Sequence, residues 1–115
     1  MNTLKLDITE LEIDEKQNEI GTKDFDRYFD YNENFKTQVI LPPNSQYRTV
    51  TFNEVTSPFA LLIVSDKLIN AKVNGSFEIT NTKMVLLNTS ISSLQIANVD
   101  LLQANVTVNI WGKQE

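Results

Sequence analysis

The segment from Phe25 to Phe35, which reads FDRYFDYNENF, combines aromatic rings with carboxylates. Rings beside carboxylates can bind a sugar, and enough carboxylate oxygens can hold a hard cation such as Ca²⁺. The same rings can instead anchor a loop or a subunit contact. The aromatic residues are Phe25, Tyr28, Phe29, Tyr31 and Phe35, and the acidic residues are Asp26, Asp30 and Glu33.

A calcium loop is the most specific chemistry that this segment could suggest. Asp24, Asp26 and Asp30 resemble such a loop, but the EF-hand pattern needs a third Asp or Asn at loop position five and Gly at position six. Counted from Asp24, these positions hold Tyr28 and Phe29. The pattern therefore fails, and we predict no metal site.

The chain contains neither cysteine nor histidine. This excludes thiolate nucleophiles, cysteine-ligated metals and every Ser-His-Asp arrangement, and it removes the commonest general base. Paired carboxylates could still support a hydrolase. We predict that the protein is not an enzyme and that it carries no cofactor.

The formal net charge of −5 is unevenly distributed. Residues 1–36 hold ten acidic and five basic residues, whereas residues 37–115 hold five of each. Nucleic-acid-binding proteins need clustered Lys and Arg, so we predict no nucleic-acid partner. An acidic N-terminal third suits a solvated surface or a basic partner.

The length of 115 residues fits one domain, which we expect over residues 1–115. No apolar run is long enough for a transmembrane helix, so we predict no membrane partner. The N-terminal stretch MNTLKLDITELEIDEK is acidic and alternating, so we do not expect it to act as a secretory signal.

Alternating apolar residues predict β-strands along the chain. The first lies over Leu4–Ile13, with a bulge near Thr9–Glu10, where the alternation changes parity. Residues 14–24 are polar and read as a loop, so residues 1–36 are expected to form an acidic strand followed by an aromatic crossover. Further strands are expected over Gln38–Leu41, which Pro42 and Pro43 would end, and over Tyr47–Val55.

The second half of the chain gives clearer signals. Phe59–Val64 (FALLIV) predicts a strand that is buried on both faces or ends in a subunit contact. Lys67–Val73 continues as a strand, and Asn74-Gly75 predicts a type I′ hairpin turn. Phe77 begins the returning strand, and Met84–Leu87 forms another. In the last strand, Ala104, Val106, Val108 and Ile110 are expected to face inward, and Asn105, Thr107, Asn109 and Trp111 outward.

Eight or nine short strands without an amphipathic helix predict an all-β fold: a single antiparallel β-sandwich, jelly-roll-like. The chain has only three glycines. We therefore expect Asn to occupy the turn positions that require positive φ.

Residues 79–112 carry only two charges, Lys83 and Asp100, and their polar positions hold Asn, Thr, Ser and Gln. Exposed strands of monomers usually carry charge, which blocks pairing between edges. A neutral, hydrogen-bonding β surface is expected where another subunit covers it, because interface cores are depleted of charge. The alternative is a polar face on a monomer with low charge.

The elements SPFALLIVSDKLINAKVNG and MVLLNTSISSLQIANVDLLQANVTVNIWG follow one another within the segment from Val50 to Gly112. In this order of strands, turns and a terminal VTVNIWG strand, the segment resembles the small β-sandwich virion proteins of tailed bacteriophages. The resemblance covers about half of the chain. It implies a structural role in a virion, as a capsid-associated, decoration or tail component, and it brings no catalytic or ligand motif.

Together these observations predict a non-enzymatic structural protein of a phage particle. It would be made in the host cytoplasm and act through subunit packing, with itself as a homo-oligomer and with other virion proteins as partners. The aromatic segment would pin the crossover to the sandwich or to a neighbouring subunit, with Asp26, Asp30 and Glu33 toward water. The interface candidates are Phe25, Tyr28, Phe29, Tyr31, Phe35, Asn105, Thr107, Asn109 and Trp111.

Two alternatives remain open. One is a carbohydrate- or ligand-binding module that would use the rings of Tyr28, Tyr31, Tyr47 and Trp111 as stacking platforms. Its hydrogen-bond partners for the ligand would be Asp26, Asp30 and Asn34. The other is an acidic inhibitor whose residues 7–33 would occupy the basic groove of a partner.

Overall fold

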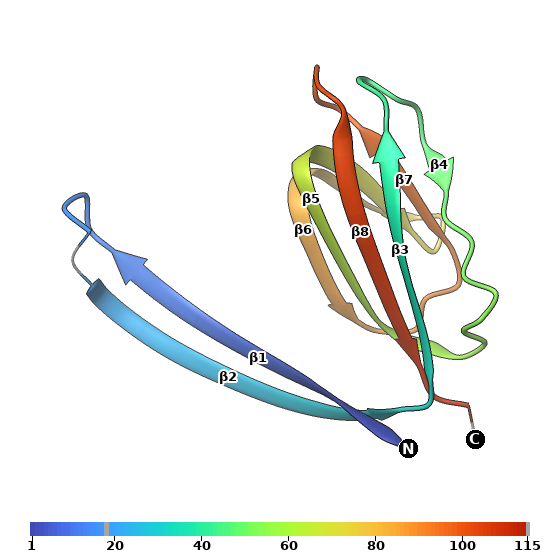
Figure 1. Cartoon of the computed structure of the whole chain (residues 1–115), viewed down its shortest axis with the longest axis horizontal. Coiled ribbons are helices and arrows are strands. Elements are labelled where there is room, and N and C mark those ends of the chain that lie inside the picture. Colours follow the sequence, from blue (N-terminus) through green and yellow to red (C-terminus); the bar gives the residue numbers. More distant parts are fainter. Residues whose placement is uncertain (18, 115) are drawn as a thin grey trace. The chain divides into compact units, whose positions relative to one another are not determined.

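The computed structural model describes residues 1–17 and 19–114, and this part of the chain contains β-strands and no helix (Figure 1). The chain divides into two compact units, Met1–Tyr31 and Asn32–Glu115. The predicted all-β class and antiparallel sandwich are confirmed. No helix of the described chain is both long and apolar enough to cross a membrane.

The first unit is a two-stranded antiparallel hairpin of β1 (Asn2–Ile13) and β2 (Glu19–Tyr31), which we call the arm. The prediction of a loop over residues 14–24 is wrong from Glu19 onward, and the segment expected to be a crossover is strand. Polar residues can form a strand here because a two-stranded ribbon leaves much of its surface to water.

The predicted bulge near Thr9–Glu10 is also wrong. The pairing of β1 with β2 stays in register from Asn2 to Glu12 and shifts only between Glu12 and Ile13. The change of parity instead places Leu11 on the opposite face from Leu4, Leu6 and Ile8, where it is 54% exposed.

The second unit contains the other strands: β3 (Glu33–Leu41), β4 (Arg48–Thr49), β5 (Pro58–Val73), β6 (Phe77–Asn88), β7 (Leu94–Asn98) and β8 (Ala104–Gly112). Their order in the sheet is β3-β8-β5-β7-β4, and β6 pairs with β5. The β5–β6 hairpin curves strongly (Figure 1), so the sheet curls into two layers.

Strand β5 connects the two layers because it changes partner along its length. Its first half, Pro58–Ser65, pairs with β8, and its second half, Ile69–Val73, pairs with β7. Strand β6 follows both halves. The first layer is therefore β3, β8 and the first half of β5 with β6, and the second layer is β4, β7 and the second half of β5 with β6.

Side-chain hydrogen bonds to the backbone fix the bend in this hairpin. Ser65 Oγ donates to the Lys67 carbonyl at 2.7 Å, and Thr82 Oγ1 donates to the Met84 carbonyl at 2.8 Å. Across the strands, Asn70 Oδ1 accepts from the backbone N–H of Asn81 at 2.9 Å. These bonds satisfy polar groups that the interrupted ladder would leave unpaired.

The inward faces of the two layers form one hydrophobic core. The predicted inward residues of the last strand are confirmed, since all four are fully buried, and the turn by Pro42 ends β3 at Leu41 as predicted. Phe35, Val39 and Phe52 pack against this core from its margin. The largest fully buried apolar residues are Leu41, Leu61, Ile63, Ile69, Leu94, Ile96 and Ile110.

Asparagine occupies most positive-φ positions outside glycine, as predicted. Asn74 and Gly75 have φ angles of 57° and 75°, as the hairpin turn between β5 and β6 requires, and Asn44 and Asn81 have φ angles of 50° and 53°. The Asn74 carboxamide oxygen also accepts from the backbone N–H of Ser92 at 2.6 Å. This bond joins the turn to the segment before β7.

Several predicted strand boundaries are wrong. The strand predicted over Gln38–Leu41 begins earlier, at Glu33. The strand expected over Tyr47–Val55 is reduced to Arg48–Thr49, because a turn closed by the bond from Val55 N to the Phe52 carbonyl leads the chain away. Phe59–Val64 and Lys67–Val73 are one strand, β5, and Phe77 and Met84–Leu87 both lie in β6.

The buried side chain of Asn98, at the end of β7, bonds to the chain that follows β3, and its removal tests how much these bonds stabilise the sandwich. It is 1% exposed, and its amide nitrogen donates to the carbonyls of Pro42 and Leu102 at 3.0 and 2.8 Å. Asn98→Ala leaves both carbonyls without this donor, so we expect a loss of about 3 kcal/mol in the free energy of unfolding. Urea denaturation measures it. The exposed Asn53→Ala is the control and should change stability by less than about 0.5 kcal/mol; equal losses in both variants would contradict this role.

Candidate functional site

The outer face of the first layer spans four strands and combines the residues that sequence analysis placed outward on the last strand. Because directly paired residues point to the same side of a sheet, the registers define its rows. One row is Lys36, Asn109, Leu62 and Leu86, and the next is Gln38, Thr107, Val64 and Met84. Asn34, Trp111, Ala60 and Asn88 form a third row toward the end of β8. We call these twelve residues the neutral face.

The neutral face carries one charged residue, Lys36, among its twelve positions. On β8, Thr107 and Asn109 are half-buried, and Asn34 Nδ2 donates to Asn109 Oδ1 at 2.7 Å. Trp111 is buried, with 8% of its surface exposed. Asn34 and Asn109 therefore already hydrogen-bond each other, which lowers the cost of covering these two side chains with another surface.

One side of the neutral face is apolar, and sequence analysis missed this part. Leu62, Val64, Met84 and Leu86 lie side by side on β5 and β6, and we call them the apolar strip. Val64 is 46% and Met84 62% exposed. The FALLIV run was expected to be buried on both faces or to end in a subunit contact. The first alternative is wrong, because Leu61 and Ile63 are buried in the core whereas Val64 is 46% exposed.

Asp66 borders the neutral face at the bend of β5. Its carboxylate accepts from the backbone N–H and from Nδ2 of Asn105, at 2.8 and 3.0 Å. These bonds from Asn105 lower the pKa of Asp66 from its ordinary value. Asn105, an interface candidate, is thus exposed but engaged with a carboxylate at the margin of the face.

Glu33 has a structural role that the sequence did not reveal. Its carboxylate accepts hydrogen bonds from the backbone N–H and Oγ1 of Thr56, at 3.0 and 2.8 Å, and from the backbone N–H of Ser57 at 3.1 Å. The expectation that Glu33 points only toward water is wrong. The bonds from Thr56 are the main reason that the pKa of Glu33 lies below its ordinary value.

Gly112 lies at the same junction, where the chain is too crowded for a side chain. A Cβ added there would lie 2.5 Å from Val55 Cγ1 and 2.8 Å from the Ser57 carbonyl oxygen. The Gly112 carbonyl also accepts from the backbone N–H of Asn32 at 3.1 Å. Together with Glu33, this glycine fixes the beginning of β3 and the segment before β5 against the end of β8.

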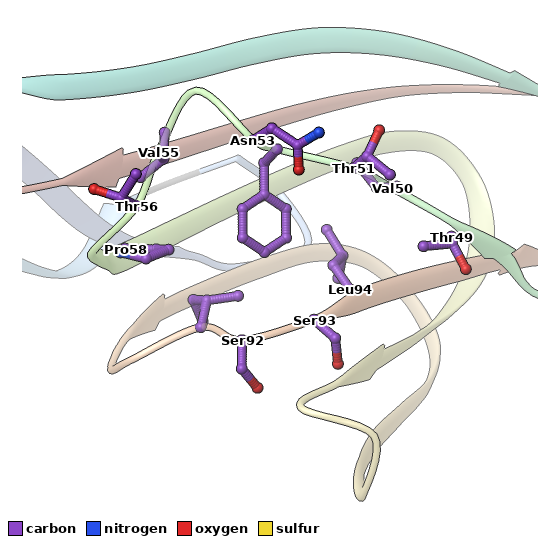
Figure 2. Close-up of a pocket in the computed structure, with 12 residues that line it drawn as sticks. Thr49, Val50, Thr51, Asn53, Val55, Thr56, Pro58, Ser92, Ser93 and Leu94 are labelled. Atoms are coloured by element: carbon purple, nitrogen blue, oxygen red, sulfur yellow. The ribbon is translucent and has the colours of Figure 1, made fainter.

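A cleft of about 580 Å³ lies between residues 49–58 and residues 91–94 (Figure 2). Figure 2 shows Ser92 and Ser93 on one side, with Thr51 and Asn53 across from them. No ionisable side chain is among the described residues that line it. The cleft therefore offers neutral hydrogen-bonding groups and apolar contacts, and none of its lining side chains is a general base.

On the outer face of the second layer, Tyr47 is engaged by charged neighbours. Its hydroxyl donates to Glu78, and Lys72 Nζ lies 4.6 Å from the centre of its ring. Burial, and then the bond to Glu78, raise the pKa of Tyr47 to about 12. One face of the ring is covered by the lysine, which leaves less of it available for stacking on a ligand.

The aromatic segment is divided between the two units. Phe25, Phe29 and Tyr31 share one face of the arm, and Tyr28 lies on the other, where it is 63% exposed. Phe35 lies in β3, packed against the core of the sandwich. Three of the four rings in the arm therefore share one face, and the ring of Tyr28 lies on the opposite face.

Within the part of the chain that the structure describes, no group of three or more acidic residues is arranged to hold a metal ion. No family model matches the chain, and comparisons with curated proteins and with solved structures found no match.

The hydrogen bonds of Glu33 predict a pH-dependent effect of Glu33→Gln. The pKa of this carboxyl is lower in the folded protein than its ordinary value of 4.5, so the unfolded chain binds the proton more tightly and the stabilisation is present above that value. It is lost as the pH falls through the folded-state pKa. We expect Glu33→Gln to be less stable than the parent at pH 7 and the difference to shrink at about pH 3.

Urea denaturation of both proteins at the two pH values measures this difference. Asp66, whose pKa is also lowered, is present in both proteins, so its contribution cancels. A stability difference that is the same at both pH values would show that the charge of Glu33 is not what holds the turn.

Proposed function

We propose that the protein is a non-enzymatic structural subunit that assembles with copies of itself, as a component of a bacteriophage particle. The observation that carries the proposal is the neutral face: four adjacent strands present twelve positions with a single charge, of which ten are at least partly exposed and two, Ala60 and Trp111, are buried. An exposed sheet surface of this kind favours association, since charge is the usual means of preventing it.

The contact would combine two kinds of interaction. The apolar strip supplies hydrophobic burial, at roughly 25 cal/mol per Å² of apolar surface removed from water. The Asn and Thr side chains of β8 supply hydrogen bonds that can be exchanged with a partner. The resemblance of residues 50–112 to small β-sandwich virion proteins supports the same role.

The two alternative functions, a sugar-binding module and an acidic inhibitor, receive different support. The stacking platforms required for a sugar-binding module do not converge: Trp111 is buried, Tyr47 is covered by Lys72, and Tyr28 and Tyr31 lie on opposite faces of the arm. An acidic inhibitor would be consistent with the carboxylates on the Tyr28 side of the arm, but nothing about that face requires a basic partner in preference to water.

Val64→Lys tests the neutral face. The substitution places a charge in the apolar strip at a position that is 46% exposed, so it should oppose subunit contact while leaving the sandwich folded. We expect the parent protein to form an oligomer in light scattering and Val64→Lys to shift toward the monomer mass.

Leu101→Lys is the matched control, because Leu101 is 79% exposed in the loop before β8 and lies outside the neutral face. This variant should keep the parent mass. A parent protein that stays monomeric at high concentration, or a Val64→Lys oligomer of unchanged mass, would refute the proposed contact.

A further inference from the structure

The two faces of the arm differ in chemistry. Residues that are paired across β1 and β2 point to the same side, so the register assigns each side chain to a face. The apolar arm face carries six apolar or aromatic residues together with two acids and two bases: Leu4, Leu6, Ile8, Phe25, Phe29 and Tyr31, with Glu10, Glu12, Lys23 and Arg27. The acidic arm face carries four carboxylates and one lysine: Asp7, Asp24, Asp26 and Asp30, with Lys5.

The apolar arm face is not buried within the arm. Among the described residues of 1–31, no side chain is buried, and Ile8 is 40% exposed. An isolated two-stranded hairpin is marginally stable in water unless its apolar face packs against something else. On the other face, Asp7 lies directly opposite Asp26, and Lys5 Nζ lies 3.9 Å from the Asp7 carboxylate, so this face adds charges rather than apolar contacts to the hairpin. The arm therefore needs a partner surface on its apolar side.

The charges of the two units indicate which surface of a second copy fits. Residues 1–31 carry nine acidic and four basic residues, a net charge of −5, whereas residues 32–115 carry six of each. The apolar arm face itself carries two acidic and two basic residues, so the net charge of −5 comes from the acidic arm face and from residues 14–19. Two arms packed through their apolar faces would still lie side by side with a net charge of −5 each, and like charges repel, although salt weakens this repulsion. The neutral face carries a single charge and therefore avoids this repulsion. Its apolar part is the apolar strip on β5 and β6.

The area of one arm face indicates how many arm contacts a stable assembly needs. A hairpin of 12-residue strands is about 40 Å long and about 10 Å wide, so one face covers roughly 400 Å². One such contact is half of what a typical stable interface buries on each partner, about 800 Å². The apolar strip spans only two positions on each of two strands, so the rest of the arm face would lie on other residues of the neighbouring copy. A copy that both donates its arm and receives the arm of another buries at most about 800 Å² in these contacts, which requires arms to be exchanged between copies.

We propose that, in the assembled protein, the apolar arm face of one copy packs on the apolar strip of another copy. This inference rests on the proposed function, in which the neutral face is a subunit contact, and it adds the segment that covers that face. The acidic arm face then points outward to water. If two copies each place their arm on the other, a closed dimer results. If each copy places its arm on the next copy around a symmetry axis, a closed ring results.

Cysteine cross-linking tests the arrangement cleanly, because the natural chain has no cysteine. Leu6→Cys places a thiol on the apolar arm face, and Met84→Cys places one on the apolar strip. The two variants are purified separately, mixed in reducing buffer at low concentration, concentrated and oxidised. A disulfide between the two different variants can then form only between copies. Tyr28→Cys, on the acidic arm face, replaces Leu6→Cys in the control mixture.

We expect a disulfide to form between the cysteines at positions 6 and 84, and peptide mass spectrometry identifies it. In the control mixture, in which the cysteine is at position 28 instead of position 6, we expect no such disulfide. If light scattering shows an oligomer but the 6–84 disulfide is absent, the arm is placed wrongly while the proposed subunit contact stands. Predominant 6–6 disulfides would overturn the inference in favour of arm-to-arm packing. A double variant, Leu6→Cys with Met84→Cys, that closes its disulfide within a monomer would overturn it as well. A protein that is monomeric at every concentration would overturn both the inference and the proposed function.

Discussion

The bend in β5 is the constraint on which the rest of the sandwich depends. Between the pairs Val64–Met84 and Ile69–Thr82, residues 65–68 of β5 stand opposite a single residue of β6, and this bulge lets β5 leave β8 and join β7. Both halves keep their apolar residues toward the interior, as the burial of Ile63 and Ile69 shows. A straight β5 would pair with one neighbour along its length, and the inward face of β8 would lose its opposing layer. The hydroxyl of Ser65 contributes to this bend by its hydrogen bonds with the backbone of Lys67.

The first half of β5, which precedes this bend, contributes to the proposed contact surface. With Leu61 and Ile63 turned inward, the alternating positions Leu62 and Val64 must point outward, because successive side chains of a strand face opposite sides. In a larger protein a helix or another sheet could cover them. In this unit the second layer covers only the inner face, and apolar residues remain on the surface beside the Asn- and Thr-rich β8.

Sequence reasoning was most accurate where local chemistry is decisive. Strict alternation identified the inward face of β8, and Asn-Gly identified a turn with two positive φ angles. It failed where tertiary pairing decides: the polar residues of β2 are strand because β1 lies beside them, and most of Tyr47–Val55 is loop although it alternates. The neutrality of the C-terminal strands could be seen in the sequence. Their combination with Val64 and Met84 on one face could not, since it depends on the register between β5 and β6.

The chain has one tryptophan, and its position separates the two units spectroscopically. Trp111 lies near the end of β8 and is 8% exposed, so its emission should report on the unfolding of residues 32–115. The arm contains no tryptophan, so its contribution to a melting curve would be visible in other signals, such as far-ultraviolet circular dichroism of the backbone. Denaturation followed by the two signals should then coincide only if arm and sandwich unfold together. A fluorescence curve by itself would describe the sandwich and leave the arm unobserved.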